Sequence, residues 1–137
     1  MQQVDLIRVP PAGALAPTSE AVVLPGGLTF ICGQGPIEDG RVSSGSIERE
    51  TSLTLLNLLA VVESLGGSSA SVVRCTCYLA NLADVPAFNA IYARTFVGAL
   101  PARTAVGAAL QAGMKVEVEA VAWLPQPASF PDTELGR

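Results

Sequence analysis

Histidine is absent from the 137 residues of this chain. Its absence excludes the Ser-His-Asp and Cys-His nucleophile systems, the HExxH zinc site and every mechanism with a histidine general base. Any catalysis must therefore use arginine, glutamate, backbone groups, hydroxyls or thiols.

Charged and aromatic side chains are also scarce, at 15% and 5%, whereas hydrophobic residues make up 50% of the chain. A single small domain of this composition would expose apolar surface as a monomer, so we expect a homo-oligomer. The length fits one domain with a real core, which we place at residues 1–124. A Pro-containing tail follows at residues 125–137.

The chain has no basic run, and its formal net charge is -4. This balance argues against nucleic acid or an anionic membrane surface as the main partner. No stretch approaches about 18 uninterrupted apolar residues, and the first residues lack the basic and apolar regions of a signal peptide. We therefore expect a soluble, cytoplasmic protein that does not insert into a membrane.

Three cysteines are too few, and odd in number, for a disulfide framework. Cys75 and Cys77 would point the same way from one strand, a geometry that does not suit a bond between them. The thiols also lack partner ligands for zinc, so we predict no metal site. Buried structural roles are favoured for all three, and Cys32 has no histidine base that would make it a nucleophile.

The pattern of apolar residues and turn signals predicts eight elements. We expect strands at 4–9, 20–24, 28–32, 71–80, 103–108 and 115–124, with helices at 46–65 and 84–97. In strand 71–80 one face would hold Val73, Cys75, Cys77 and Leu79; in strand 115–124 one face would hold Val116, Val118, Ala120 and Ala122. The prediction is an α+β domain, with two helices packed on one face of a mixed sheet and an open face that oligomerisation buries.

Arg103 stands in Pro101-Ala102-Arg103-Thr104, at the head of a predicted strand. Pro101 stiffens the backbone just before Arg103. A guanidinium held in this way suits bidentate binding of a carboxylate and stays charged at any relevant pH. A salt bridge at the surface or at an interface is the alternative interpretation.

Glu117 and Glu119 lie on one face of the last predicted strand. Two carboxylates this close repel each other in a half-buried cleft, which raises one pKa towards the range of a general base. A solvated strand face is the alternative, and periodicity does not choose between the two.

Gly33-Gln34-Gly35-Pro36 follows the third predicted strand and should end it. Its glycines permit the backbone to approach a ligand closely, although a simple turn explains them equally well. The segment lacks the features of a phosphate-binding loop.

A set of short segments carries a resemblance to a known family. The segments are Ala-Pro-Thr-Ser-Glu-Ala-Val (16–22), Phe-Ile-Cys-Gly-Gln-Gly-Pro (30–36), Phe-Asn-Ala-Ile-Tyr (88–92), Pro-Ala-Arg-Thr-Ala-Val (101–106) and Val-Glu-Val-Glu-Ala-Val-Ala (116–122). Each is weak alone, but their order and spacing are specific. From Pro17 to Trp123 the chain resembles the Rid family, the reactive intermediate deaminases also called YjgF-like proteins.

The resemblance implies a fold like that of trimeric chorismate mutase, with a homotrimer whose sheets form an inner barrel and whose clefts lie between subunits. It also implies cofactor-independent hydrolysis of reactive 2-imino or enamino acids to 2-oxo acids and ammonia. Residue by residue, it implies that Arg103 grips the substrate carboxylate and that Glu117 orients the attacking water. Gly33, Asn89 and the backbone at Ala105 would contact the substrate.

Three positions depart from the family pattern: Thr18 replaces a tyrosine, Glu20 a glutamine and Cys32 a serine. Thr18 and Cys32 would therefore line a larger and altered cleft. One alternative is a catabolic deaminase for a bulkier substrate, such as an aminomuconate-like compound. Another is a protein that binds a 2-oxo acid without turnover. Some family members have reported ribonuclease activity, against which the net charge argues.

Overall fold

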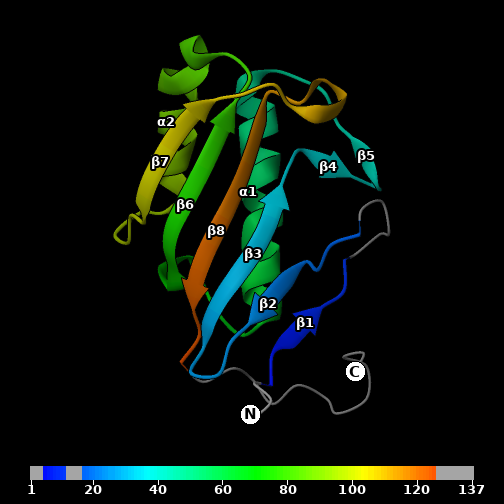
Figure 1. Ribbon diagram of the computed structural model, residues 1–137. Helices are drawn as coiled ribbons and strands as arrows, with labels where there is room; N and C mark the ends of the chain where they lie inside the picture. The colour runs from blue at the N-terminus through cyan, green and yellow to red at the C-terminus, as the bar shows by residue number, and fades with distance from the viewer. Residues whose placement is uncertain (1–4, 12–16, 126–137) are drawn as a thin grey trace.

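The structure is a computed structural model, which describes residues 5–11 and 17–125. Its main element is a six-stranded sheet with the strand order β1-β2-β3-β8-β6-β7 (Figure 1). The strands are β1 (Ile7–Val9), β2 (Ala21–Val23), β3 (Leu28–Gln34), β6 (Val72–Leu79), β7 (Ala102–Gly107) and β8 (Val116–Trp123). Only the β6–β7 pair is parallel among the pairs in this sheet, so the predicted mixed sheet is confirmed.

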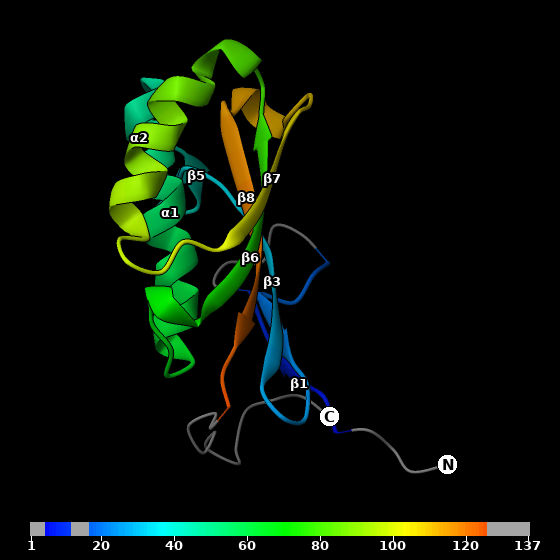
Figure 2. The same ribbon diagram turned by 90° about the vertical axis from the view of Figure 1, so that its left-hand side faces the viewer.

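Two helices, α1 (Ile47–Ser64) and α2 (Val85–Thr95), lie on the same side of this sheet (Figure 2). Helix α1 starts where expected because the Ser46 hydroxyl accepts a hydrogen bond from the Arg49 amide at 3.1 Å. It ends at Ser64, and Gly66, just beyond the C-cap Leu65, has a φ of 88° that suits a residue without a side chain. The predicted α+β class is therefore confirmed. The predicted tail lies outside the described residues from position 126 onward.

The core lies between the helices and the sheet. Alternate residues of β8 are buried towards the helices, as the sequence pattern predicts for Val116, Val118, Ala120 and Ala122. Cys75 and Cys77 are also buried, with unpaired thiols, in agreement with a structural role.

Strand β3 runs two residues further than predicted. We expected Gly33 to end it, but the strand continues to Gln34 through an irregular register against β8 between Ile31 and Gln34. Asn57 of α1 then fixes the turn that follows, because its Nδ2 donates to the carbonyls of Gly35 and Ile37, both at 2.9 Å. A small hairpin, β4 (Ile37–Glu38) with β5 (Arg41–Val42), was not predicted.

The predicted faces of β6 are wrong at its first two residues. Val72 is buried, whereas Val73 is 46% exposed. The register explains this, because Val72 pairs with Ala122 and Arg74 pairs with Val121, so Val73 is an extra residue in the ladder. Beyond this bulge Cys75, Cys77 and Leu79 face the core as predicted.

No element of the described chain covers the sheet face opposite the helices (Figure 2). Phe30 and Trp123 project there and are 47% and 54% exposed. This face is the open face that the sequence predicts. Among residues 5–11 and 17–125, no helix is long and apolar enough to span a bilayer.

Candidate functional site

Arg103 lies on β7, the edge strand, and its side chain lies against α2. Its Nη1 donates a hydrogen bond to Asn89 Oδ1 at 2.7 Å. The guanidinium carbon lies 4.9 Å from the ring centre of Tyr92 and 5.7 Å from that of Phe88. An asparagine and two aromatic faces thus fix the orientation of the guanidinium, while Nη2 makes no hydrogen bond to any other described residue.

The two rings that contact Arg103 belong to a stack along α2. Ring centres of Phe88 and Tyr92 are 5.6 Å apart, and those of Tyr92 and Phe96 are 4.8 Å apart. Burial raises the pKa of Tyr92, with a further contribution from Cys75, so the phenol stays neutral beside the guanidinium. The sequence analysis did not foresee that these rings contact Arg103.

Ala105 lies two residues beyond Arg103 on β7, and therefore on the same face of that strand. It is half-buried and packs against the core, opposite Cys77 of β6. We call Arg103, Asn89 and Ala105 the anchor cluster.

Glu117 lies on β8, on the face that points away from the helices. It packs against Gly33, since a methyl group on Gly33 would lie 2.9 Å from Glu117 Oε1. Burial raises the pKa of Glu117, and the neighbouring charge of Glu119 adds to the effect. Gly33 thus makes room for a carboxylate whose pKa is raised, which is the direction that favours a general base.

Glu119 has a different environment from that of Glu117. Its Oε1 accepts a hydrogen bond of 2.6 Å from the Tyr78 hydroxyl, a contact that raises the pKa of Tyr78. Glu117 accepts no hydrogen bond from another described residue. The two carboxylates are therefore distinguished by their partners, and Glu117 is the one available to a water molecule.

Cys32 is half-buried, and the charge of Glu117 is among those that act on its thiol. Gln34 Nε2 lies 3.3 Å from both the sulfur and the carbonyl oxygen of Cys32, and 3.1 Å from Glu20 Oε1. Burial, together with the charge of Glu20, raises the pKa of Cys32 to about 11. The thiol therefore stays protonated at neutral pH, which agrees with the structural role favoured from the sequence.

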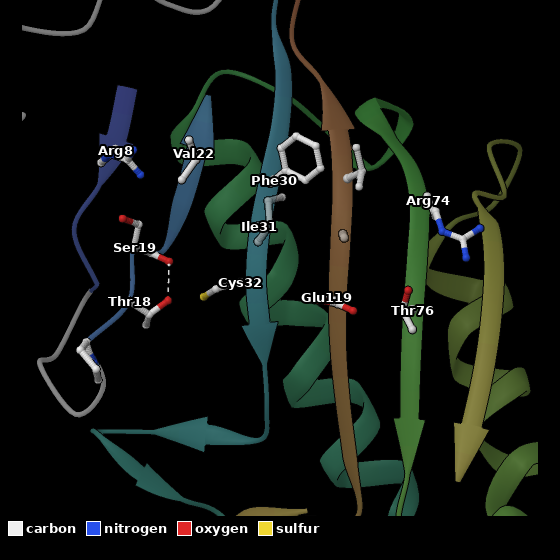
Figure 3. A pocket seen from close by; sticks show the side chains of 13 residues that line it. Arg8, Thr18, Ser19, Val22, Phe30, Ile31, Cys32, Arg74, Thr76 and Glu119 are labelled. Carbon is white, nitrogen blue, oxygen red and sulfur yellow. Dashed lines mark hydrogen bonds between the residues drawn. The ribbon is translucent and has the colours of Figure 1, made fainter. Parts of the chain in front are cut away.

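Thr18 is exposed and lines a broad hollow of about 690 Å³ on the open face. In Figure 3 the thiol of Cys32 points towards Thr18, while Phe30 and Glu119 lie further along the hollow. Arg8 and Arg74 line other parts of it. The carboxylate that lines this hollow is Glu119. We call Gly33 and Glu117, which contact each other, the base cluster.

The anchor cluster and the base cluster do not meet within one chain. Arg103 pairs with Cys75, whose side chain is buried on the helix side of the sheet. Glu117 pairs with Tyr78 and points to the opposite side. The structure thus brings Arg103 to Asn89 and Glu117 to Gly33, but leaves the two groups on different faces of the sheet.

Metal-binding side chains do not gather in the described part of the chain, which contains no group of three or more Cys, Asp or Glu residues that could hold an ion. What the two clusters offer is a fixed cation and a carboxylate with a raised pKa. These groups suit the binding of an anion and the activation of water.

Comparison with known proteins gives consistent results. The sequence model described as endoribonuclease L-PSP matches residues 10–124. Protein DfrA of Myxococcus xanthus is 38% identical over 113 residues, covering 80% of this chain and 86% of its own. The human 2-iminobutanoate/2-iminopropanoate deaminase is 34% identical over 113 residues, covering 80% of this chain and 82% of its own. A crystal structure of a putative endoribonuclease L-PSP from Entamoeba histolytica superposes with a TM-score of 0.79 at 34% identity, covering 89% of this chain and 100% of that one.

Proposed function

The chain belongs to the endoribonuclease L-PSP family, also called the YjgF/Rid family, and from this premise we propose that it hydrolyses 2-imino acids to 2-oxo acids and ammonia. The observation that carries the proposal is the fixed guanidinium of Arg103, held by Asn89 and two aromatic rings. The name of the human relative gives the reaction type. A carboxylate is the group that every 2-imino acid presents next to its reacting carbon.

The proposed site forms between subunits of a homotrimer. Its support is that Arg103 and Glu117 lie on opposite faces of one sheet, so one chain cannot direct both at a single substrate. The open face, with Phe30 and Trp123 exposed, offers apolar surface that association would bury. Arg103 of one subunit would then face Glu117 of the next.

In the proposed mechanism Arg103 binds the carboxylate of R–C(=NH)–COO⁻ and sets the position of the imine carbon. Glu117 accepts a proton from a water molecule as its oxygen adds to that carbon. That proton passes to the nitrogen and gives a carbinolamine. The hydroxyl of the carbinolamine then loses its proton to the nitrogen as the C–N bond breaks, and the products are R–CO–COO⁻ and NH₃. The step exchanges nitrogen for oxygen without net oxidation, so it requires no redox cofactor.

The test uses an imine made in situ from alanine with an amino acid oxidase, in the presence of semicarbazide, which traps the imine that escapes hydrolysis. The protein should reduce semicarbazone formation, and Arg103→Ala should lower kcat/KM about 100-fold because the substrate is no longer held. Arg94→Ala, an exposed change in the last turn of α2, is the matched control. Unchanged activity of Arg103→Ala in an intact oligomer would refute the assignment.

A second candidate is a protein that binds a 2-oxo acid without turnover. Thr18 favours it, because a small exposed side chain there leaves the hollow open to water. If the protein only binds a 2-oxo acid, pyruvate should bind saturably and imine loss should not be accelerated. Efficient turnover would exclude this second candidate. Ribonuclease action, which the family description suggests, is disfavoured by the net charge of -4.

A further inference from the structure

Tyr92 touches the guanidinium of Arg103 but has no part in the mechanism proposed above. Its ring centre lies 4.9 Å from the guanidinium carbon, closer than that of Phe88 at 5.7 Å. Both rings are buried, and they lie one turn apart on α2, so they face the same way. The aromatic surface that meets Arg103 therefore belongs to the core.

The ring of Tyr92 is itself held from several sides. It packs between Phe88 and Phe96, with ring centres 5.6 Å and 4.8 Å away. The buried Cys75, which stands beside Arg103 in the β6–β7 ladder, is close enough to raise the pKa of the Tyr92 phenol. Tyr92 cannot turn without disturbing these neighbours, and so it offers the guanidinium a fixed surface.

The groups that orient Arg103 carry no charge. Asn89 Oδ1 accepts a hydrogen bond of 2.7 Å from Nη1, and the rings supply the other contacts. Neither of the ion pairs found within residues 5–11 and 17–125 involves Arg103. A carboxylate in place of these groups would orient the guanidinium equally well, but it would also compete with the carboxylate of a substrate. The observed partners thus fix the cation and leave its charge available.

The amide and the ring restrict different movements. A single hydrogen bond to Asn89 fixes one nitrogen but lets the guanidinium rotate about that bond. The Tyr92 ring lies on another side of the group and opposes this rotation. Together they keep the free nitrogen, Nη2, pointing in one direction. The position of a bound carboxylate, and of the imine carbon next to it, follows from that direction.

We propose that Tyr92 is a positioning residue, whose ring holds the guanidinium of Arg103 in the orientation that brings the imine carbon to the general base. This inference rests on the proposed imine hydrolysis and adds a residue to its site. Without the ring, Arg103 keeps its charge and still binds carboxylates, but no longer at one position. The hydroxyl is not required, because it is buried and has no hydrogen-bond partner of good geometry in the described part of the chain.

The experiment replaces the ring while Arg103 stays in place. Tyr92→Leu should lower kcat/KM for the alanine imine about tenfold, mostly through kcat, because binding survives and positioning does not. Tyr92→Phe keeps the ring and should keep kcat/KM. Phe96→Leu is the matched control: it removes a buried ring from the same stack that has no contact with the guanidinium. It should lower the melting temperature as Tyr92→Leu does, but leave kcat/KM unchanged.

A double-mutant cycle separates positioning from a general structural effect. In the Arg103→Ala background, Tyr92→Leu should cause no further loss, since the ring acts through Arg103. Phe88→Leu removes the more distant ring and should cost about threefold, again only when Arg103 is present, so it serves if Tyr92→Leu does not fold.

Three results would overturn the inference alone. These are an equal loss in both backgrounds, an equal loss in Phe96→Leu, and a loss in Tyr92→Phe as large as in Tyr92→Leu. Absence of turnover by the wild-type protein with every imine would overturn the proposed function as well.

Discussion

Glu117 and Glu119 share one face of β8, but they have different partners. Glu119 accepts a short hydrogen bond from Tyr78, whereas Glu117 packs against Gly33, the residue that leaves room for its carboxylate. The two groups nevertheless interact through space, because the charge of Glu119 contributes to the raised pKa of Glu117. If Glu117 is the general base, its raised pKa sets the activity at low pH, and the charge of Glu119 therefore affects that activity.

Glu119→Gln should therefore extend activity to lower pH. The base must be ionised, so kcat/KM falls as the pH drops through the pKa of Glu117. Removing the neighbouring charge lowers that pKa, and the acid limb should move down by several tenths of a pH unit. Burial, the larger cause, remains, so the pKa stays above its ordinary value.

The measurement is the pH profile of kcat/KM with the alanine imine, after subtraction of the rate without protein. Glutamine still offers an oxygen to Tyr78, so the local structure should be kept. Glu48→Gln, an exposed change in α1, should leave the limb where it is. An acid limb that stays fixed or moves to higher pH in Glu119→Gln would mean that Glu117 is not the titrating base.

The sequence identifies Arg103 as a candidate from its place after Pro101 and Ala102. It does not identify the aromatic rings that hold the guanidinium. Phe88 and Tyr92 have the four-residue spacing of a buried helix face, and that spacing says nothing about a cation above the rings. The contact arises because α2 connects parallel strands and crosses back over β7. Such a contact depends on tertiary packing, which periodicity does not encode.

At the scale of elements, an ion pair between the buried Glu50 and the partly exposed Lys115 joins the start of α1 to the start of β8. Glu50 is fully buried and accepts hydrogen bonds from Lys115 N at 2.9 Å, Lys115 Nζ at 3.0 Å and Gly45 N at 3.2 Å. Burial alone would raise the pKa of Glu50, but these donors outweigh it and hold the pKa below its ordinary value. The pair therefore stabilises the fold in its charged form.

Glu50→Gln should lower the free energy of unfolding by about 2 kcal/mol at pH 7, because a charged acceptor with three donors is lost. The folded pKa lies below the unfolded value of about 4.3. The contribution is thus complete above the unfolded pKa and is lost as the pH falls through the folded one. The difference between variant and wild type should shrink below about pH 4.

Urea unfolding at several pH values and one protein concentration measures this difference. Glu48→Gln changes the same charge on the exposed side of the same helical turn and should cost only a few tenths of a kcal/mol. A difference that is constant from pH 7 to pH 3 would show that the charge of Glu50 contributes nothing.

The sequence predicted the long elements well and their irregularities poorly. The helix expected at 46–65 is α1, because an N-capping serine and two glycines mark its ends. The bulge at Val73 and the extension of β3 through Gly33 escaped prediction, since both depend on the register against β8. The second of these matters for the proposed function, because it places Gly33 against Glu117.

At the scale of the whole molecule, the sheet separates the two clusters that the proposed reaction requires. The anchor cluster lies on the helix side at edge strand β7, and the base cluster lies on the open side towards β3. Composition predicts association, and the open face offers apolar residues for it. If each site is made by two subunits, a variant with a damaged anchor cluster and a variant with a damaged base cluster should restore activity when they assemble in one oligomer.

Arg103→Ala and Glu117→Gln should each be inactive alone and active when mixed in one oligomer. A site needs Arg103 from one subunit and Glu117 from the next, so random assembly of equal amounts restores about a quarter of all sites, which is about one site in each mixed trimer. Co-expression with two different affinity tags isolates the mixed oligomers, and the alanine imine reports their activity. Mixing the separately folded variants without dissociation serves as the control and should restore none. A site built within one chain would stay inactive in every mixture, because each chain would still carry one defect.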